Sequence, residues 1–212
     1  MRIVFLLLSL LCVSWVSTAY AGFDLGISVG DEGIRGFHLA IGDYYRVPER
    51  EVLVVRERRI PDEEIPVVFF LASRARVAPS TIIDLRLSGR SWLDITLHYG
   101  LSPEIFYIPV DIKKMGPPYG KAYGYYKNKP KKEWKKMKFS DGDVVDLVNL
   151  KFISEHYKYS PEKVIQMRGE GKKFVSINDT AYKEKHGSKE KSKEKFDADK
   201  EKHGKGRGKK NH

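Results

Sequence analysis

The residues best suited to binding chemistry lie between residues 115 and 138, where aromatic rings alternate with lysines. Rings stack on bases or other flat ligand faces, and ammonium groups pair with anionic groups. This combination predicts contact with a single-stranded nucleic acid or an anionic glycan. The alternative is a solvated linker whose rings lie across neighbouring helices. The candidate anion-binding residues are Lys121, Lys127, Lys131, Lys132, Lys135 and Lys136, and the candidate aromatic contacts are Tyr123, Tyr125, Tyr126 and Trp134.

Two arginines, Arg86 and Arg168, stand 82 positions apart at matching places in two similar stretches of the chain. A guanidinium group recognises a carboxylate or a phosphate through two parallel hydrogen bonds. Each arginine is therefore a candidate anion-binding residue. Each could equally cap the preceding helix or pair with a carboxylate of the protein, and the sequence leaves these roles open.

The residue patterns of known catalytic and metal sites are missing from the sequence. There is no nucleophile-elbow serine motif, no phosphate-binding glycine loop and no His-Glu-x-x-His motif. The single cysteine, Cys12, lies in an apolar leader, and His38, His98 and His156 are widely separated. We therefore expect no cofactor, no metal and no catalytic site. An envelope enzyme with an unfamiliar site is the alternative.

Residues 1–21 have the pattern of a secretory signal peptide. Arg2 gives a positive start, residues 3–16 are almost entirely apolar, and a small-x-small cleavage site ends at Ala21. The alternative is an uncleaved membrane anchor, but the apolar run is shorter than the ~20 residues of a spanning helix. We expect cleavage after Ala21, a periplasmic or secreted protein, and no stable membrane span after cleavage.

The chain of 212 residues carries 39 Lys and Arg against 28 Asp and Glu, a formal net charge of +11, and 41% of its residues are hydrophobic. This composition excludes a fibrous or wholly disordered protein and suits a modest folded core. Residues 183–212 contain eleven Lys and one Arg against six acids, without apolar periodicity. They are expected to form a disordered basic tail.

Residues 22–60 are expected to form a Gly-rich β-hairpin region. Residues 23–29 alternate apolar with small or polar side chains, and Phe37, Leu39 and Ile41 repeat that period after a turn at residues 30–33. A third element at residues 51–58 is either a strand or a helix. The expected fold class is therefore mainly α with a small β N-terminal part (α+β).

An ungapped shift of 82 positions relates residues 61–110 to residues 140–182. It pairs Phe70 with Phe152 and Trp92 with Phe174, which are expected to lie in the structural core. We infer two repeated helical units, joined by a flexible basic and aromatic linker at residues 111–139. Further matched pairs are Pro79 and Pro161, Ile83 and Ile165, and Gly89 and Gly171.

Each unit is expected to contain three short helices. The first runs over residues 62–76 or 141–157 and is capped by Asp62 or Asp141. The second begins at a proline and ends at a glycine. In the first unit, Ser91 and Asp94 form a capping pair that opens the third helix. The third helix of the second unit is expected to be short or frayed because it is rich in β-branched residues.

Residues 82–104 read IIDLRLSGRSWLDITLHYGLSPE and resemble the helix-turn-helix of bacterial transcription factors. In that family two helices and a turn lead into a recognition helix that enters the major groove. The resemblance implies that the element after Ser102 is the recognition helix, although residues 103–109 contain no Arg, Lys, Asn or Gln. A sequence-reading DNA-binding protein is therefore one alternative function.

A second resemblance spans most of the chain after residue 21. The leader, the segment GDYYRVP at residues 42–48, the duplicated helical unit and the segment PPYGKAYGYY at residues 117–126 together resemble exported proteins of Gram-negative bacteria. This resemblance implies an envelope or extracellular setting and no known activity. We therefore expect a non-enzymatic binding protein whose basic segments contact an anionic envelope polymer, a nucleic acid or another envelope protein.

Overall fold

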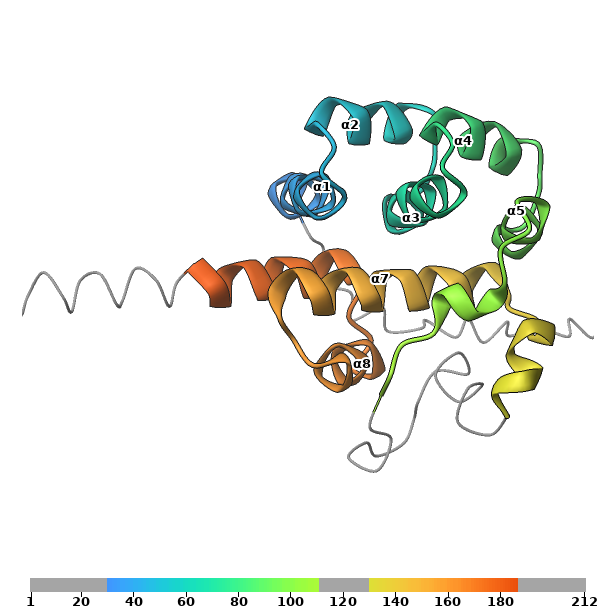
Figure 1. Ribbon diagram of the computed structural model, residues 1–212. Helices are drawn as coiled ribbons and strands as arrows, with labels where there is room; N and C mark the ends of the chain where they lie inside the picture. Colours follow the sequence, from blue (N-terminus) through green and yellow to red (C-terminus); the bar gives the residue numbers. More distant parts are fainter. Residues whose placement is uncertain (1–29, 111–129, 187–212) are drawn as a thin grey trace, which may run out of the picture.

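The computed structural model describes residues 30–110 and 130–186, without the side chains of Lys131 and Trp134 (Figure 1). Only helices occur in these ranges, so the described part of the chain is all-α. The longer helices are α1 (Asp31–Tyr45), α2 (Glu49–Glu57), α3 (Ile65–Ala75), α4 (Pro79–Leu87), α5 (Trp92–His98), α7 (Asp141–Tyr157), α8 (Pro161–Gly169) and a helix over residues 174–186. The short 3-10 helices are η1 (Asp62–Glu64), η2 (Pro103–Phe106) and η4 (Lys131–Lys136).

The predicted β-hairpin region, and with it the α+β class, is wrong in the described residues. Residues 37–41 lie inside α1, and residues 51–57 lie inside α2. Phe37 and Ile41 are fully buried, whereas Leu39 is 43% exposed. A spacing of four residues places Phe37 and Ile41 on one face of a helix, and Leu39 falls on another face. The other predicted strand, at residues 23–29, lies outside the described residues.

Two layers of helices form the first part of the fold. Figure 1 shows α1, α3 and α5 side by side in one layer, with α2 and α4 in a second layer above them. The long helix α7 crosses the α1–α3–α5 layer and packs against all three helices. α8 folds back against α7 on the far side. None of the helices in the described ranges has the length and apolar content needed to cross a membrane.

Aromatic side chains occupy the centre of the core. Phe152 on α7 contacts Phe37, Tyr44 and Tyr45 of α1, with ring centroids 5.2 to 6.4 Å apart. The four rings assigned to the core from the sequence, Phe70, Trp92, Phe152 and Phe174, are all buried. Each buried ring removes a large apolar area from water, worth about 1.5–3 kcal/mol.

Positions 82 apart share their local backbone structure. α4 and α8 span matching residues, from Pro79 and Pro161. Gly89 and Gly171 follow them with φ of 90° and 86°, a conformation that a side chain disfavours. A nine-residue helix followed by a residue with positive φ also occurs 30 positions before α4. There the helix is α2, and Arg59 stands at the position that corresponds to Gly89, with φ of 63°.

Two details of the second unit differ from expectation. The helix over residues 174–186 is longer than the short or frayed helix expected there, and it includes the first four residues of the predicted basic tail. Ser140, not Asp141, caps α7. The Ser140 hydroxyl accepts a hydrogen bond from the Asp143 amide, and the Asp143 carboxylate accepts one from the Ser140 amide. Asp141 is thereby available to another helix.

Candidate functional site

Arg86 is partly buried and is paired with two carboxylates of the protein. Its guanidinium donates to Glu64 at 3.0 and 3.1 Å and to Asp141 at 2.6 Å, and it lies over the Trp92 ring at 4.6 Å. It also donates to the carbonyl oxygen of Arg90. Burial lowers the pKa of Arg86, but the hydrogen bonds to the two carboxylates outweigh burial and leave the pKa raised. An external anion would have to displace these partners.

Arg168 repeats this arrangement 82 positions later. Its guanidinium donates to Asp146 at 3.0 Å and to the Lys172 carbonyl at 3.0 Å, and it lies over the Phe174 ring at 4.5 Å. Burial raises the pKa of Asp146 despite the neighbouring Arg168. Of the three roles left open by the sequence, pairing with a carboxylate of the protein is the one observed at both arginines.

Each helical unit also caps a helix of the other. Asp141, at the start of α7, accepts the Trp92 backbone amide of α5 at 2.7 Å. Glu63, before α3, accepts the Phe174 amide at the start of the helix over residues 174–186 at 2.6 Å. A carboxylate at a helix start satisfies a free amide and complements the helix dipole. These reciprocal contacts join residues 62–98 to residues 141–186.

The described part of the basic linker, residues 130–139, is anchored to the core. Met137 and Phe139 are buried, and the Phe139 ring meets Phe106 at 6.0 Å. The lysines beside these anchors are exposed and bind no carboxylate in the described part of the chain: Lys132, Lys135, Lys136 and Lys138. The other linker candidates, Lys121, Lys127, Tyr123, Tyr125 and Tyr126, lie outside the described residues, as do the side chains of Lys131 and Trp134.

The positive charge is unevenly distributed along the described ranges. Residues 30–110 contain ten arginines, no lysine and twelve acids, whereas residues 130–186 contain thirteen basic residues and nine acids. The described basic excess therefore lies in the second range, which includes η4.

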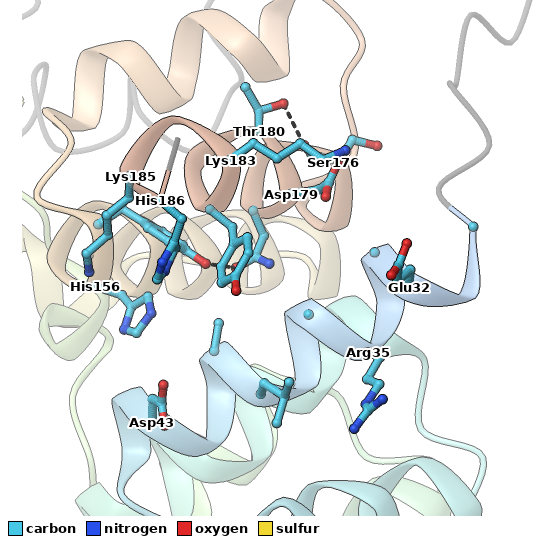
Figure 2. A pocket seen from close by; sticks show the side chains of 18 of the residues that line it. Glu32, Arg35, Asp43, His156, Ser176, Asp179, Thr180, Lys183, Lys185 and His186 are labelled. Carbon is cyan, nitrogen blue, oxygen red and sulfur yellow. Dashed lines mark hydrogen bonds and ion pairs between the residues drawn. The ribbon is translucent and has the colours of Figure 1, made fainter. Parts of the chain in front are cut away.

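A cleft that the sequence did not predict separates α1 from the helix over residues 174–186. Its volume is about 840 Å³, within the range of small-ligand sites. Figure 2 shows Glu32, Arg35 and Asp43 on the α1 wall, residues 176–186 on the opposite wall, and His156 at one end. Gly33, Gly36 and Ala40 give the α1 wall a surface of small residues.

An unsatisfied amide lies in the cleft lining. Asn178 is fully buried, and its Oδ1 accepts the Tyr157 hydroxyl at 3.0 Å. Its Nδ2 has no hydrogen-bond partner in the structure. Buried amide donors are normally paired, and an unpaired one costs about 1–3 kcal/mol. A ligand oxygen would remove this penalty only by reaching Nδ2, which the surrounding protein covers in this structure.

Two titratable groups of the cleft have pKa values shifted by burial. Burial lowers the pKa of His156, Lys185 and Lys158 lower it further, and Asp43 opposes them. Burial also raises the pKa of the Tyr157 hydroxyl, so it stays protonated and donates to Asn178. Among the described residues, no hydrogen bond joins a cleft imidazole to a carboxylate. The oriented base typical of nucleophilic catalysis is therefore not formed there.

The sequence did not indicate the cleft, because its two walls come from segments that were expected to form other secondary structures. The α1 wall lay in the expected hairpin, and the opposite wall lay in the expected frayed helix and tail. The spacing of Gly33, Gly36 and Ala40 was the available signal, since it places three small residues on one helical face.

The helix-turn-helix-like stretch lacks a long third helix. The element after Ser102 is the four-residue η2, in which Pro103 and Phe106 are buried. A recognition helix presents exposed polar side chains to base edges. No feature of η2 supports base reading.

Comparison with protein-family models, with curated proteins and with solved structures found no match to this chain. In the described ranges, no group of three or more His, Cys, Asp or Glu side chains is placed to hold a metal ion.

Proposed function

We propose that this protein is a non-enzymatic, exported binding protein that contacts an anionic polymer through its basic segment at residues 130–138. The observation that carries the proposal is the set of exposed lysines Lys132, Lys135, Lys136 and Lys138, which have no acidic partner among the described residues. Surface lysines are normally interspersed with acids. Here only Glu133 lies among them.

Anchoring favours this segment as a binding surface. Met137 and Phe139 attach it to the core, so the lysines lose less conformational freedom on binding than those of an unattached chain. Each phosphate neutralised by a lysine also releases condensed counterions, which makes binding to a nucleic acid strongly salt-dependent. A sulfated glycan offers the same charge chemistry.

The binding experiment compares two triple variants of the full chain. Lys132, Lys135 and Lys136 are changed to Gln in the first, and Arg50, Arg90 and Lys173 are changed to Gln in the control. All six positions are exposed, and Gln keeps helix propensity close to that of Lys and Arg. Affinity for oligodeoxythymidine and for heparin is measured by fluorescence anisotropy over a series of salt concentrations.

We expect the first variant to lose most of the affinity for at least one probe and the control to keep it. For the single-stranded DNA, the slope of log affinity against log salt should fall by about 2, because each lost contact removes about 0.7. Equal affinity of the first variant and the unmodified protein would contradict the proposed surface, as would binding that is independent of salt.

Export is tested separately, by fractionation of the native host and mass spectrometry of the N-terminus. The proposal expects a processed chain that begins at Gly22, in the periplasm or the medium. An intact chain found only in the cytosol contradicts this part of the proposal.

A further inference from the structure

We propose that the cleft between α1 and the helix over residues 174–186 is a second binding site, and that it takes an uncharged oligosaccharide. The site is separate from the basic segment at residues 130–138 and uses different chemistry. Three features of its lining favour this ligand: a buried donor without a partner, two carboxylates that accept no hydrogen bond from the protein, and exposed apolar side chains on both walls.

The buried donor is the Nδ2 group of Asn178. Its Oδ1 already accepts the Tyr157 hydroxyl, which fixes the orientation of the amide. Nδ2 has no partner, although the residue is fully buried and lines the cleft. Nδ2 is covered by protein atoms, so a ligand oxygen reaches it only where the side chains over it move aside.

The carboxylates belong to Glu32 and Asp43 on the α1 wall. Neither accepts a hydrogen bond in the part of the chain that the structure describes. Both are exposed to solvent, where water donates to them, and both are open to the hydroxyl groups of a ligand. A hydroxyl-rich ligand donates to these groups and also accepts from Asn178.

The cations of the cleft already have partners within the protein. Lys183 pairs with Asp179 at 2.7 Å, and Lys172 pairs with Glu170 at 3.3 Å. Arg35 lies 3.9 Å from Glu49, and Lys185 lies over the Tyr157 ring. Figure 2 shows basic and acidic side chains on both walls. This mixed lining, in which the cations are already paired, favours an uncharged ligand over a polyanion.

The apolar groups lie on opposite walls. Leu39 of α1 is 43% exposed, and Tyr182 is 49% exposed with its ring 4.2 Å from that of His186. A sugar ring has an apolar face that can cover such side chains and an edge of hydroxyl groups. Polar groups are spread along both walls, which favours a polyhydroxy ligand over a peptide, since a peptide carries one donor and one acceptor per residue on its backbone.

The test uses a larger side chain at a glycine of the cleft wall where a Cβ has open space. Gly36 lines the cleft, and a Cβ built there has no atom within 4 Å. Gly36→Leu therefore places a side chain in open space and improves helix propensity. Gly142→Leu is the matched control, since Gly142 is an exposed glycine of α7 away from the cleft. Asn178→Leu removes the unpaired donor, and thermal unfolding followed by circular dichroism checks that each variant folds.

The full-length protein and the variants are applied to a printed array of neutral and sulfated oligosaccharides and to an array of hexapeptides. We expect binding to one or more neutral oligosaccharides, a loss of at least about ten-fold in affinity with Gly36→Leu and with Asn178→Leu if it folds, and no change with Gly142→Leu. The Lys132, Lys135 and Lys136 triple variant should bind these neutral probes normally.

Three outcomes overturn the inference. The first is no binding to any neutral oligosaccharide. The second is binding only to sulfated probes that is lost in the lysine triple variant, which would place all recognition on the basic segment. The third is binding to hexapeptides that Gly36→Leu abolishes, which would make the cleft a peptide site. Because the lysine and glycine variants act on separate surfaces, failure here is distinguishable from failure of the proposed polyanion binding.

Discussion

Replacing Arg86 by Met should destabilise this protein more than almost any other single change at a charged residue. Met preserves much of the aliphatic stem but removes the guanidinium, which leaves Glu64 without its partner and Asp141 with only the Trp92 amide. The Arg86 and Glu64 side chains are each 19% exposed. Removing one member of a buried ion pair costs about 3–5 kcal/mol, and partial exposure reduces this to about 2–4 kcal/mol.

Urea unfolding followed by far-ultraviolet circular dichroism measures this loss, since the described fold is helical. Arg50→Met is the control: Arg50 is exposed and has no partner in the described residues, so its replacement should change the free energy of unfolding by less than about 0.5 kcal/mol. Arg168→Met should fall between the two, because Arg168 has one carboxylate partner and is more exposed than Arg86.

A double-mutant cycle distinguishes a lost interaction from a general packing defect. Adding Glu64→Leu to Arg86→Met removes a carboxylate that has lost its partner, so the double variant should be more stable than the sum of the two single losses predicts. A loss below about 0.5 kcal/mol for Arg86→Met would refute the reasoning. Strict additivity in the cycle would also refute it.

Two further predictions concern α1 and the cleft. A Cβ at Gly42 would lie 3.0 Å from the Val47 carbonyl oxygen, so Gly42→Ala should lower the free energy of unfolding by about 1–3 kcal/mol. Gly36→Ala in the same helix has open space and should be neutral or stabilising by up to about 1 kcal/mol. Thermal unfolding measures both changes, and the reverse order would contradict this packing. Burial and the nearby Lys185 and Lys158 lower the folded-state pKa of His156, so its contribution to stability is present above the ordinary histidine pKa of about 6.5 and is lost as pH falls through the lowered value. The urea concentration at the unfolding midpoint should therefore decrease as the pH is lowered from about 7.5 to about 5, and His156→Gln should make that decrease smaller. An equal decrease in both proteins would refute the assignment to His156.

The helix ranges of residues 61–110 and 140–182 follow largely from local sequence signals. Pro79 and Pro161 begin helices in the structure, and Gly89 and Gly171 follow their ends with positive φ. Ser91 caps α5 by accepting the Asp94 amide, as predicted. These features depend on residues close together in the chain, so they can be predicted without the tertiary fold.

The first helix shows where such local signals fail. Phe37, Leu39 and Ile41 satisfy the two-residue period of a strand, yet Phe37 and Ile41 also satisfy the four-residue spacing of a helix. Packing against Phe152 of α7 buries Phe37, and that contact joins residues 115 positions apart. The sequence offered no local basis for choosing between the two periods.

The sequence by itself determined the charge distribution, the starts of α4, α5 and α8, and the aromatic residues available for a core. It did not determine whether Arg86 and Arg168 meet a ligand or a carboxylate of the protein, because that choice depends on Glu64, Asp141 and Asp146, which folding brings to them. The cleft was likewise decided by the tertiary structure alone. Its walls are separated by more than 130 residues in the chain, and only helix packing places them opposite each other.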